Sequence, residues 1–454
     1  MRIQKQTITG WGRMSPVEVE IITPKTLESI QEIISNASSY SLIPRGLGRS
    51  YGDAAQLKNG SVICLDYFNQ IQFDSSNSTV TVGGGVSFGK LLELVVPRGF
   101  FLPVSPGTRN VTVGGAIAAD VHGKNHHADG SFGNHISRIL IVDGNGDLVE
   151  LTPNEDDYSE YSKFWATVGG MGLTGVIIEA TFTLIPIDTS LISVDTFRFN
   201  DLDSLMAAMI EGDSLYRYSV AWVDSLNYKG RGILTNGDHA FLEQLNQPNK
   251  DNPLYYNPQA IGGAPTFLPN GLLNKLTVRA FNEAWFRRSP KSAKGELQGI
   301  ASYFHPLDGI KDWNRIYGPS GFLQYQFVVP DKGSYLISHT LEALRRVGAQ
   351  SFLTVLKRFG PENPGFLSFP KPGWTLAIDL PAGSSDLLSV LCQIDEKVAS
   401  AGGRIYLAKD SRQSPEVFER TYSTLAKWKS IRSSLDPKNI FSSDIAMRLN
   451  LNLE

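Results

Sequence analysis

The sequence predicts an α+β protein of two domains, in which short strands are separated by glycine-rich turns. At 454 residues the chain is too long for one simple core, so two domains are expected. Short β-branched runs recur through residues 1–186, whereas from residue 187 helical patterns alternate with strands of an antiparallel sheet. We therefore expect a first domain over 1–186, a substrate-binding domain over 187–403, and a C-terminal segment, 404–454, that returns to the first domain.

In the first domain the expected elements follow one another closely. Residues 17–23 form a strand, and the amphipathic pattern after Pro24 predicts a helix over 25–37. A second short helix is expected within 87–99, and two β-rich runs around an Asp-Gly-Asn-Gly-Asp turn predict a hairpin over 135–152. A long strand over 176–186 closes the domain.

The second domain shows longer helical patterns. Helices are expected over 201–212, 334–348 and 387–402, and strands over 218–224, 321–330, 351–360 and 373–381. Residues 236–290 are rich in Asn, Pro and Gly, so we expect a long excursion or a mobile lid there. The C-terminal segment predicts a strand over 404–412 and one helix over 414–435.

The composition excludes some classes of function. With 41% hydrophobic and 10% aromatic residues the chain is globular, and a formal net charge of −3 argues against nucleic-acid binding. Residues 1–14 lack the apolar core of a secretory signal, and no stretch approaches the roughly 18 apolar residues that a bilayer-spanning helix needs. We expect a cytoplasmic protein, for which peripheral contact with the inner membrane stays open.

The first chemical motif is PRGLGRSYGD, residues 44–53. Gly46, Gly48 and Gly52 allow the backbone N–H groups to converge on an anion, and Arg45 and Arg49 add positive charge. A tight turn alone would not need three glycines with two arginines, so the motif predicts a pyrophosphate-binding loop.

The second motif is TVGGAIAADVHGKNHH, residues 112–127. Its histidines are split by Gly123 and Lys124, and no carboxylate or cysteine stands in a metal-ligand pattern, so we expect no metal. Because His122 and Lys124 directly follow a glycine-rich ligand loop, they are candidates for the active site. Plain surface histidines remain the alternative.

Two further signals need context. Residues 170–175 match GxGxxG, but the β-branched residues after them predict a strand rather than the helix that a Rossmann dinucleotide site requires. Lys409 stands where an apolar strand turns polar, and by itself it is more simply interpreted as an exposed lysine.

Taken together, PRGLGRSYGD, SPGTRNVTVGGAIAADVHG and FWATVGGMGLTGVI resemble the vanillyl-alcohol-oxidase (PCMH-type) FAD family. The resemblance implies a PCMH-type FAD-binding domain that holds FAD extended. Many relatives attach FAD through a histidine in the first loop; none occurs over residues 44–55, so FAD is expected to be non-covalent. The residues that match the family's FAD contacts are Arg45, Gly46, Leu47, Gly48, Arg49, Ser50, Tyr51, Gly52, Asp53, Gly107, Thr112, Val113, Gly114, Gly115, Ala119, Asp120, Val121, His122, Ile177 and Tyr406.

Other segments, including HGKNHHADGSFGNH, GRIYLAKDSR and FSSDIAMRL, are similar to members that oxidise the 2′-hydroxyl of a polyprenyl-phosphoryl ribose, the first half of its epimerisation to arabinose. The resemblance implies a polyprenyl-phosphoryl pentose substrate and a nicotinamide-dependent keto-reductase partner. Thr375 and Ala377 replace an Asn and a Cys of the mycobacterial member, which should reshape the pocket and leave hydride transfer intact. The residues matching its substrate pocket are Lys124, Trp222, Gln326, Lys357, Thr375 and Ala377.

The catalytic residues implied by the resemblance are Lys409, His122 and Tyr51. His122 and Tyr51 are alternative acceptors for the hydroxyl proton, and Lys409 would stabilise negative charge at the reduced flavin or bind sugar oxygens. Two other functions stay open: an alditol or aldonolactone oxidase of the same family that uses O2, and a non-catalytic FAD-binding subunit.

Overall fold

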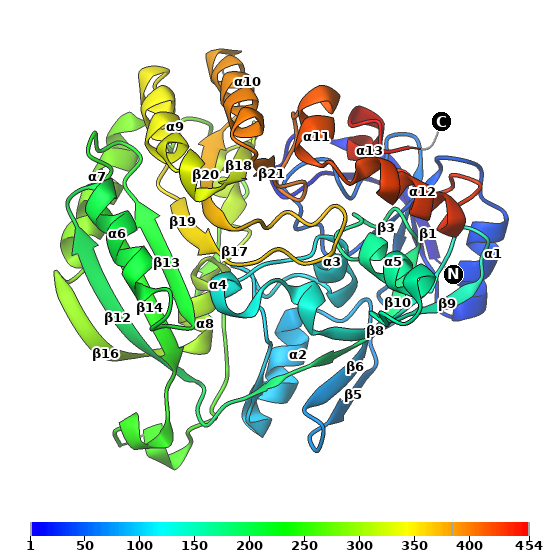
Figure 1. Cartoon of the computed structure of the whole chain (residues 1–454), viewed down its shortest axis with the longest axis horizontal. Coiled ribbons are helices and arrows are strands. Elements are labelled where there is room, and N and C mark those ends of the chain that lie inside the picture. Colours follow the sequence, from blue (N-terminus) through cyan, green and yellow to red (C-terminus); the bar gives the residue numbers. More distant parts are fainter. Residues whose placement is uncertain (1, 248, 383–384, 453–454) are drawn as a thin grey trace.

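Two sheet systems of different topology make up the two halves of the chain in the computed structural model, which describes residues 2–247, 249–382 and 385–452 (Figure 1). The first half holds a mixed sheet ordered β1-β2-β4-β3 and an antiparallel sheet ordered β5-β6-β10-β8-β9. Their strands are β1 (Arg2–Ile8), β2 (Val17–Thr23), β3 (Leu42–Arg45), β4 (Ser61–Cys64), β5 (Ile71–Asp74), β6 (Thr79–Gly83), β8 (Ile136–Val142), β9 (Leu148–Leu151) and β10 (Val176–Thr183).

Local sequence signals account for the elements of this half. Helix α1 (Leu27–Ser35) begins at Thr26, whose hydroxyl accepts a hydrogen bond from the N–H of Ser29 at 3.3 Å. The predicted helices at α1 and α2 (Phe88–Val95) and the β8–β9 hairpin are confirmed. The remaining helices are α3 (Val113–Ala118), α4 (His126–Asp129) and α5 (Tyr158–Thr167), and β7 (Phe100–Phe101) pairs with β11 (Ile185–Pro186).

The GxGxxG segment leads directly into strand β10, so the prediction against a Rossmann site is confirmed. Its glycines are instead required by the conformation and close packing of the backbone. Gly172 and Gly175 have φ of 80° and 147°, and a Cβ at Gly175 would lie 2.7 Å from the carbonyl oxygen of Val142 on the neighbouring strand. This turn therefore lets two strands approach closely.

The second half is built on one eight-stranded antiparallel sheet ordered β16-β12-β14-β13-β19-β20-β18-β21. The α+β fold with an antiparallel substrate sheet is thus confirmed. The strands are β12 (Leu191–Phe199), β13 (Tyr218–Val223), β14 (Gly232–His239), β16 (Ser292–Gly299), β18 (Phe322–Val329), β19 (Thr354–Phe359), β20 (Gly373–Pro381) and β21 (Arg404–Ile405).

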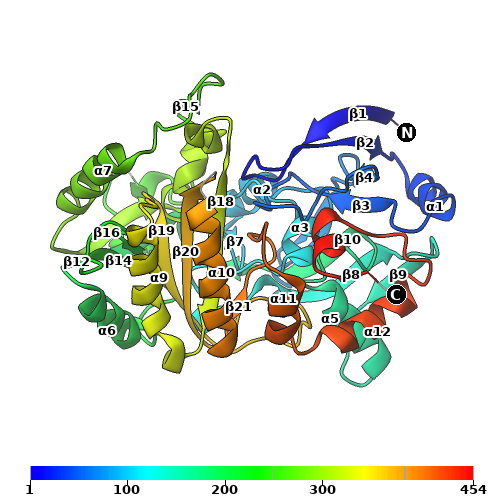
Figure 2. The same ribbon diagram turned by 90° about the horizontal axis from the view of Figure 1, so that it is seen from above.

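Helices cover one face of this sheet, and the other face meets the first half of the chain. Leu356 and Leu376 belong to a core with α6 (Leu202–Gly212), α9 (Tyr335–Arg346) and α10 (Ser385–Ser400). Val328 and Phe359, on the opposite face, belong to the core of the first half. All eight residues of β18 are consequently buried. Figure 2 shows α9 and α10 lying along the sheet, with α1 at the far end of the molecule from β12 and β16.

Two sequence expectations were wrong, and a third region holds more structure than expected. The long excursion expected over residues 236–290 contains the 14-residue helix α7 (Lys275–Arg288), capped by Asn274. The strand expected over 404–412 is only β21, Arg404–Ile405, and residues 407–409 form a turn. The single helix expected over 414–435 is two, α11 (Pro415–Thr421) and α12 (Leu425–Leu435). The break falls at Tyr422, which is fully buried and donates from its hydroxyl to the carbonyl of Ile405 at 2.9 Å. The remaining short elements are α8 (Ile300–Phe304), α13 (Asp444–Arg448) and the parallel pair β15 (Gly262–Gly263) and β17 (Ile310–Lys311).

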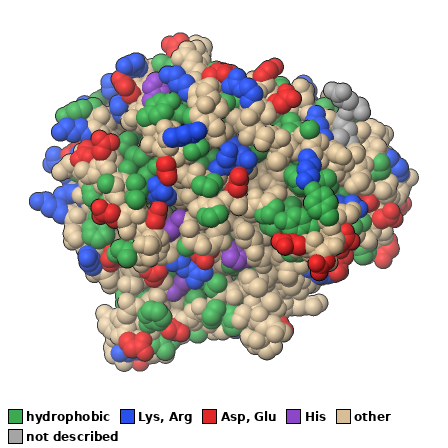
Figure 3. All heavy atoms as spheres, in the orientation of Figure 1, with side chains coloured by type: hydrophobic (Ala, Val, Ile, Leu, Met, Phe, Trp, Pro, Cys, Tyr) green, Lys and Arg blue, Asp and Glu red, His purple; other side chains and the backbone are tan. Residues whose placement is uncertain are grey.

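The C-terminal segment begins in the second sheet and ends on the first half. After β21 has paired with β18, Trp428 donates from its indole N–H to the carbonyl of Ala166 at 2.9 Å, and Arg432 donates to that of Leu173 at 3.0 Å. The division of the chain into folding units at residues 186 and 403 stays a prediction. In the described ranges, no helix combines the length and apolar character needed to cross a bilayer. Acidic and basic side chains are interspersed over the face in Figure 3.

Candidate active site

The two glycine-rich loops, distant in sequence, pack against each other and against the turn that carries Lys409. A Cβ at Gly46 would lie 2.2 Å from Oγ1 of Thr112 in the second loop. A Cβ at Gly52 would lie 1.8 Å from the carbonyl oxygen of Asp410, and the N–H of Tyr51 donates to the carbonyl of Ala408 at 2.9 Å. Only glycine fits these contacts, so the three segments pack together because the first loop lacks side chains at the two places where the others meet it.

The charged side chains of the first loop hold the loop itself. Arg45 donates to the carbonyls of Ala55 at 2.6 Å and Thr9 at 2.7 Å, and Arg49 donates to that of Asn110 at 3.0 Å. Asp53 pairs with Arg448 through both carboxylate oxygens, at 2.8 and 2.9 Å. The two arginines that were expected to add positive charge at the ligand therefore tie the loop to neighbouring backbone carbonyls. The side chain of Asp53 is occupied by its ion pair with Arg448.

The backbone of the first loop is what a ligand would meet. Gly46 and Leu47 are exposed, and no described residue accepts a hydrogen bond from the N–H groups of Leu47, Gly48, Arg49 or Ser50. Gly107, on the adjoining segment, is also exposed, with no atom within 4 Å of an added Cβ. Four successive free N–H groups beside exposed glycines are donors of the kind that bind a diphosphate.

The second loop begins as a short helix and ends at His122. Thr112 caps α3 by accepting from the N–H of Gly115 at 3.1 Å. Among the predicted cofactor residues, Val113, Val121 and Ile177 are buried in the core, and Gly114 donates its N–H to the carbonyl of Gly84 at 3.0 Å. Ala119 accepts from the hydroxyl of Tyr406 at 2.9 Å. The side chains of these core residues pack inside the protein, so contacts to a ligand would fall to their backbone.

Asp120 has a structural role that the sequence did not reveal. Its buried carboxylate accepts from Ser131 Oγ at 2.7 Å, Ser368 Oγ at 2.6 Å, Asn363 Nδ2 at 2.9 Å and the N–H of Gly133 at 2.9 Å. Its φ of 38° lies in the left-handed region, where non-glycine residues are strained. The network ties the second half of the chain to the turn immediately before His122.

One face of the eight-stranded sheet supplies most of the predicted substrate residues. Paired residues of antiparallel strands share a face, and the register pairs Lys357 with Thr375, Gln326 with Ala377, and Trp222 with Val355, which itself faces Ala377. Trp222 is fixed by donating its indole N–H to the carbonyl of Phe352 at 2.8 Å. Trp222, Gln326, Lys357, Thr375 and Ala377 therefore lie together on the face opposite the covering helices.

His122 is enclosed by this face and by aromatic rings. Its ring lies 4.8 Å from that of Phe359, 5.7 Å from Phe369 and 5.2 Å from Tyr406. The amide nitrogen of Gln326 lies 3.1 Å from Nε2 of His122 and donates to Thr375 Oγ1 at 3.2 Å. Because an amide nitrogen only donates, His122 accepts at Nε2 and carries its proton on Nδ1, which is buried without a partner.

The three histidines of the second loop thus make different contacts. His126 is buried and accepts at Nδ1 from the N–H of Gly360 at 3.2 Å, while Nε2 of His127 lies 2.9 Å from the carbonyl oxygen of Tyr216. The reading of all three as surface histidines is therefore wrong for His122 and His126. Within the described ranges, no group of three His, Cys, Asp or Glu side chains is arranged to hold a metal ion.

Lysines around His122 form a cationic cluster. Burial, and then the charge of Lys357, lower the pKa of Lys124 to about 7, and burial lowers that of Lys357 to about 8. Burial lowers the pKa of His122 well below its ordinary value, and the charges of Lys357 and Lys409 lower it further, so His122 is neutral at pH 7. Lys124 donates to the carbonyl of Tyr303 at 2.5 Å and lies 3.8 Å from the centre of that ring.

Lys409 and Tyr51 lie together on the other side of the cluster. The amine of Lys409 lies 3.8 Å from the centre of the Tyr51 ring. Burial and the nearby charge of Asp379 raise the pKa of Tyr51 well above its ordinary value, which argues against a phenolate acting as proton acceptor. Burial lowers the pKa of Lys409, although the charge of Asp379 partly opposes this.

Sequence reasoning missed Asp379, a fully buried carboxylate. It lies on the same face of β20 as Thr375 and Ala377, and we call this side of the sheet the polar face. Asp379 accepts from the amide of Gln324 and, at 3.4 Å, from the hydroxyl of Tyr317. Burial raises the pKa of Asp379, and the charge of Lys409 opposes this shift. An acidic residue inside the apolar run GWTLAIDLP was the available signal, because a carboxylate in a buried strand needs a functional or structural partner.

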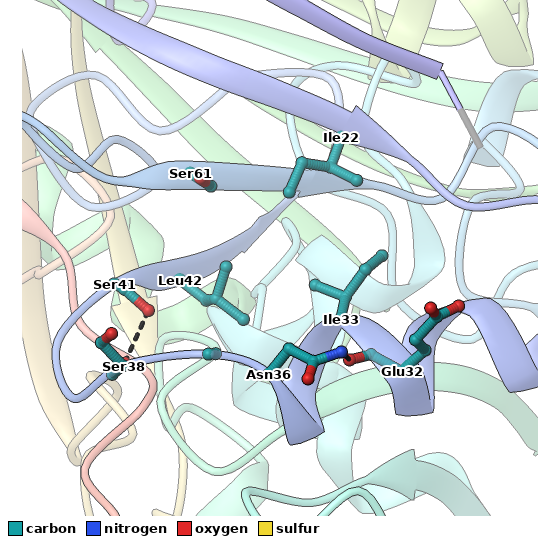
Figure 4. A pocket seen from close by; sticks show the side chains of 9 residues that line it. Ile22, Glu32, Ile33, Asn36, Ser38, Ser41, Leu42 and Ser61 are labelled. Atoms are coloured by element: carbon teal, nitrogen blue, oxygen red, sulfur yellow. Dashed lines mark hydrogen bonds between the residues drawn. The ribbon is translucent and has the colours of Figure 1, made fainter.

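A hollow of about 330 Å³ lies elsewhere, between α1 and strands β2, β3 and β4 (Figure 4). Ile22, Ile33 and Leu42 line it together with small polar side chains. Glu32 is its one ionisable lining residue, and the hollow contains none of the predicted site residues. We therefore place the candidate active site at the junction of the two loops, the polar face and the Lys409 turn.

Comparisons with known proteins agree with this geometry. The family model of the FAD binding domain matches residues 20–152, and that of D-arabinono-1,4-lactone oxidase matches residues 389–449. The protein is therefore an FAD-dependent oxidoreductase of the PCMH type. Decaprenylphosphoryl-β-D-ribose oxidase of Mycolicibacterium smegmatis is 40% identical over 452 residues, 98% of this chain and 97% of that protein. The chain belongs to the family of this oxidase.

Two other relatives place the chain within the larger group. An uncharacterized protein of Streptomyces coelicolor is 38% identical over 381 residues, 81% of this chain and all of that protein. Alditol oxidase of a Streptomyces species is 25% identical over 182 residues, 39% of this chain and 42% of that protein. The high identity over nearly full length thus lies with the decaprenylphosphoryl-β-D-ribose oxidase.

The described residues fit FAD. Free N–H groups of residues 47–50 suit the diphosphate, and the buried Nδ1 of His122, which has no partner among the described residues, is available to donate to a ligand oxygen. The glycines at 46 and 107 leave room where side chains would block a ring system or a sugar.

Proposed function

We propose that this protein oxidises the 2′-hydroxyl of a polyprenyl-phosphoryl ribose to the 2′-ketone. The cluster of Lys124, Lys357 and Lys409 near the neutral ring of His122, beside the glycine loops, is the observation that carries the proposal. Buried cations need an anionic partner, and a phosphoryl group attached to a sugar supplies one next to the hydroxyl to be oxidised. Bound FAD supplies the acceptor for the hydride that leaves the carbon.

The protein's own residues orient the hydroxyl and handle its proton. In the tautomer fixed by Gln326, His122 donates from Nδ1, so it holds the substrate oxygen rather than deprotonating it. Tyr51 remains a phenol and packs under the amine of Lys409. Lys409, whose pKa is lowered by burial, has a neutral fraction able to accept the proton; once charged, it stabilises negative charge nearby.

Residues on the polar face of the sheet select the substrate. Lys124 and Lys357 bind the phosphoryl oxygens, while Trp222 and Gln326 form the walls around the sugar. Thr375 and Ala377 set the pocket's shape: Thr375 is engaged by Gln326, and Ala377 leaves space next to it. The two positions should affect substrate fit more than the rate of hydride transfer.

The proposal extends to cofactor attachment, a partner enzyme and location. FAD is bound without a covalent link, because no histidine occurs over residues 44–55, and acid precipitation should release it into the supernatant. The ketone requires a nicotinamide-dependent keto-reductase to become the arabinose epimer. We propose that the protein acts in the cytoplasm, at the inner membrane where a polyprenyl substrate resides.

Anaerobic flavin bleaching tests the function. Farnesyl-phosphoryl ribose should bleach the flavin of the purified holoenzyme, whereas free ribose should leave it oxidised. Bleaching by free sugars or alditols, with stoichiometric hydrogen peroxide in air, would instead establish the second candidate, an alditol or aldonolactone oxidase. The match of residues 389–449 to D-arabinono-1,4-lactone oxidase is the observation that favours this second candidate.

A further inference from the structure

Helix α7 packs against the protein through one narrow row of side chains, and most of the helix surface is exposed to solvent. Val278, Asn282 and Phe286, spaced four residues apart, are its buried residues. Asn282 donates to Asp224 at 2.8 Å, which fixes the helix to the end of strand β13. Figure 2 shows α7 and β15 projecting from the body of the molecule.

The outward side of α7 is apolar to an unusual degree. Leu276 is 80% exposed, and Phe281 and Trp285 are each 45% exposed, with Ala280 and Ala284 also exposed between them on the helical wheel. The rings of Phe281 and Trp285 stack with centres 6.2 Å apart. We call these five residues the α7 face. A soluble protein seldom displays such a patch unless something binds to it.

Positive charge surrounds the α7 face. Arg279, Arg287 and Arg288 are exposed on the same helix, and Lys291 and Lys294 follow on the chain. Glu283, the helix's one acidic residue, is neutralised by ion pairs with Arg231 and Arg287, both at 2.5 Å. Because the whole chain has a formal net charge of −3, this cationic edge is a local feature. Apolar aromatic groups ringed by arginines are typical of a helix lying on an anionic lipid surface.

A packed aromatic cluster connects the α7 face with the candidate active site. Ring centres are 5.5 Å apart for Phe281 and Phe352, and 6.1 Å for Phe352 and Tyr317. Tyr317 stacks on Phe322 at 4.0 Å, and Phe322 lies 5.4 Å from Tyr51, over whose ring the amine of Lys409 is placed. Phe322 is fully buried and Tyr317 is nearly so, so these rings pack as a core that holds α7 close to the Lys409 turn.

We propose that the α7 face docks on an anionic membrane surface, and that this docking holds the active site next to the membrane in which the polyprenyl chain of the substrate lies. The second part rests on the proposed function, whereas the first part stands on α7 alone. Exposed loops at Ile261 and Phe267, 96% and 82% exposed, precede α7 and add apolar side chains to the same excursion.

Vesicle flotation of the full-length holoenzyme tests the docking surface. The protein should float with vesicles of phosphatidylglycerol and phosphatidylcholine, and pure phosphatidylcholine vesicles should leave most of it unbound. The double variant Arg279→Gln/Arg288→Gln should lower partitioning on the order of 20-fold, from about fivefold per basic residue. Leu276→Ser/Trp285→Ser should lower it by a similar factor.

Matched changes elsewhere provide the control. Tyr67→Ser/Leu148→Ser removes apolar side chains that are 52% and 44% exposed in the first half of the chain, and Lys5→Gln/Lys438→Gln removes equal charge. Both should float like the unchanged protein. Absence of flotation with anionic vesicles, or an equal loss in the controls, would overturn the docking surface.

Flavin bleaching separates this inference from the proposed function. Leu276→Ser/Trp285→Ser should oxidise soluble farnesyl-phosphoryl ribose at the unchanged rate, yet react at least tenfold more slowly with a decaprenyl substrate embedded in anionic vesicles. Equal rates on the embedded substrate would overturn the link between membrane docking and substrate delivery. If neither substrate bleaches the flavin of the unchanged protein, the proposed function fails, while flotation still decides the docking surface.

Discussion

The two faces of the eight-stranded sheet have opposite chemistry, although their residues alternate along the same strands. In β20, Leu376 and Ile378 face the helices α6, α9 and α10, whereas Thr375, Ala377 and Asp379 lie on the opposite face, toward the first half of the chain. Both sets are largely buried. Burial therefore does not distinguish a core from an active site; the distinction lies in what the opposite surface offers, aliphatic helices on one side and glycine loops with cations on the other.

Within a single strand, residues on the helix face therefore contribute to stability, and residues on the polar face contribute to the candidate active site. Leucine and isoleucine on the helix face gain free energy through removal of apolar surface from water. Lys357 on the polar face and the neighbouring Lys124 and Lys409 are desolvated at a cost, which a bound anionic ligand would offset. Substitutions on one face should consequently change folding, and substitutions on the other should change catalysis.

The largest effect is expected for Lys409→Ala. Without its amine, the site loses both a proton acceptor and a positive charge, so flavin reduction by substrate should fall on the order of 10³-fold. FAD content should be unchanged, because the loop over residues 44–53 keeps its contacts. Stopped-flow bleaching measures the rate, and Lys397→Ala, which changes an exposed lysine of α10, is the control. Near-normal reduction would remove Lys409 from the mechanism.

On the helix face, Leu376→Ala should destabilise the fold. Leu376 is fully buried, so the cavity should lower the free energy of unfolding by about 2–5 kcal/mol. Urea denaturation measures this loss, and the rate of flavin reduction per folded molecule should stay within a factor of about two. A stable but inactive variant would show that the faces are not separate in function.

The pH dependence of substrate affinity should report the cationic cluster. Lys357, with its pKa lowered to about 8, is protonated below that pH and loses its charge above it. The KM for the phosphoryl substrate should therefore rise about tenfold between pH 7 and 9. Lys357→Arg keeps its charge throughout and should flatten this rise. An identical profile in the variant would mean that Lys357 does not bind the phosphoryl group.

The smallest effect is expected for Thr375→Val. The variant retains the side-chain shape but loses the oxygen that accepts from Gln326 at 3.2 Å, a contact worth about 1 kcal/mol. KM should rise about fivefold as Gln326 and His122 become less well ordered, while thermal stability changes little. Loss of flavin reduction altogether, measured under the same anaerobic conditions, would place Thr375 closer to the chemistry than we propose.

Much of the fold was predictable because local signals were strong. The alternating pattern of residues 373–381, the hairpin over 135–152 and the strand after GxGxxG all appear as expected. Helix α7 was not predicted, since the Asn, Pro and Gly residues before it dominated the pattern of residues 236–290. The break between α11 and α12 was also missed, because it depends on Tyr422 being buried against β21.

Many residues of the candidate site could be predicted from the sequence, but the contacts that their side chains make could not. Both glycine loops could be assigned to a phosphate-bearing cofactor from their composition. Arg45, Arg49 and Asp120 were expected to face the ligand, yet their side chains hold protein backbone or close a polar network. A charged residue in a loop has many possible partners, and only its neighbours in space determine which partner it binds.

By itself, the sequence determined the local conformations of this protein and the chemical class of its cofactor. Glycine spacing, strand alternation and helix caps act over a few residues, so their effects can be predicted without knowing the rest of the fold. Tertiary structure alone decided that His122, Lys357 and Lys409 share one cluster, and that Asp379 lies within their electrostatic reach. These contacts depend on strand register and on packing between the two halves of the chain, which no short stretch of sequence specifies.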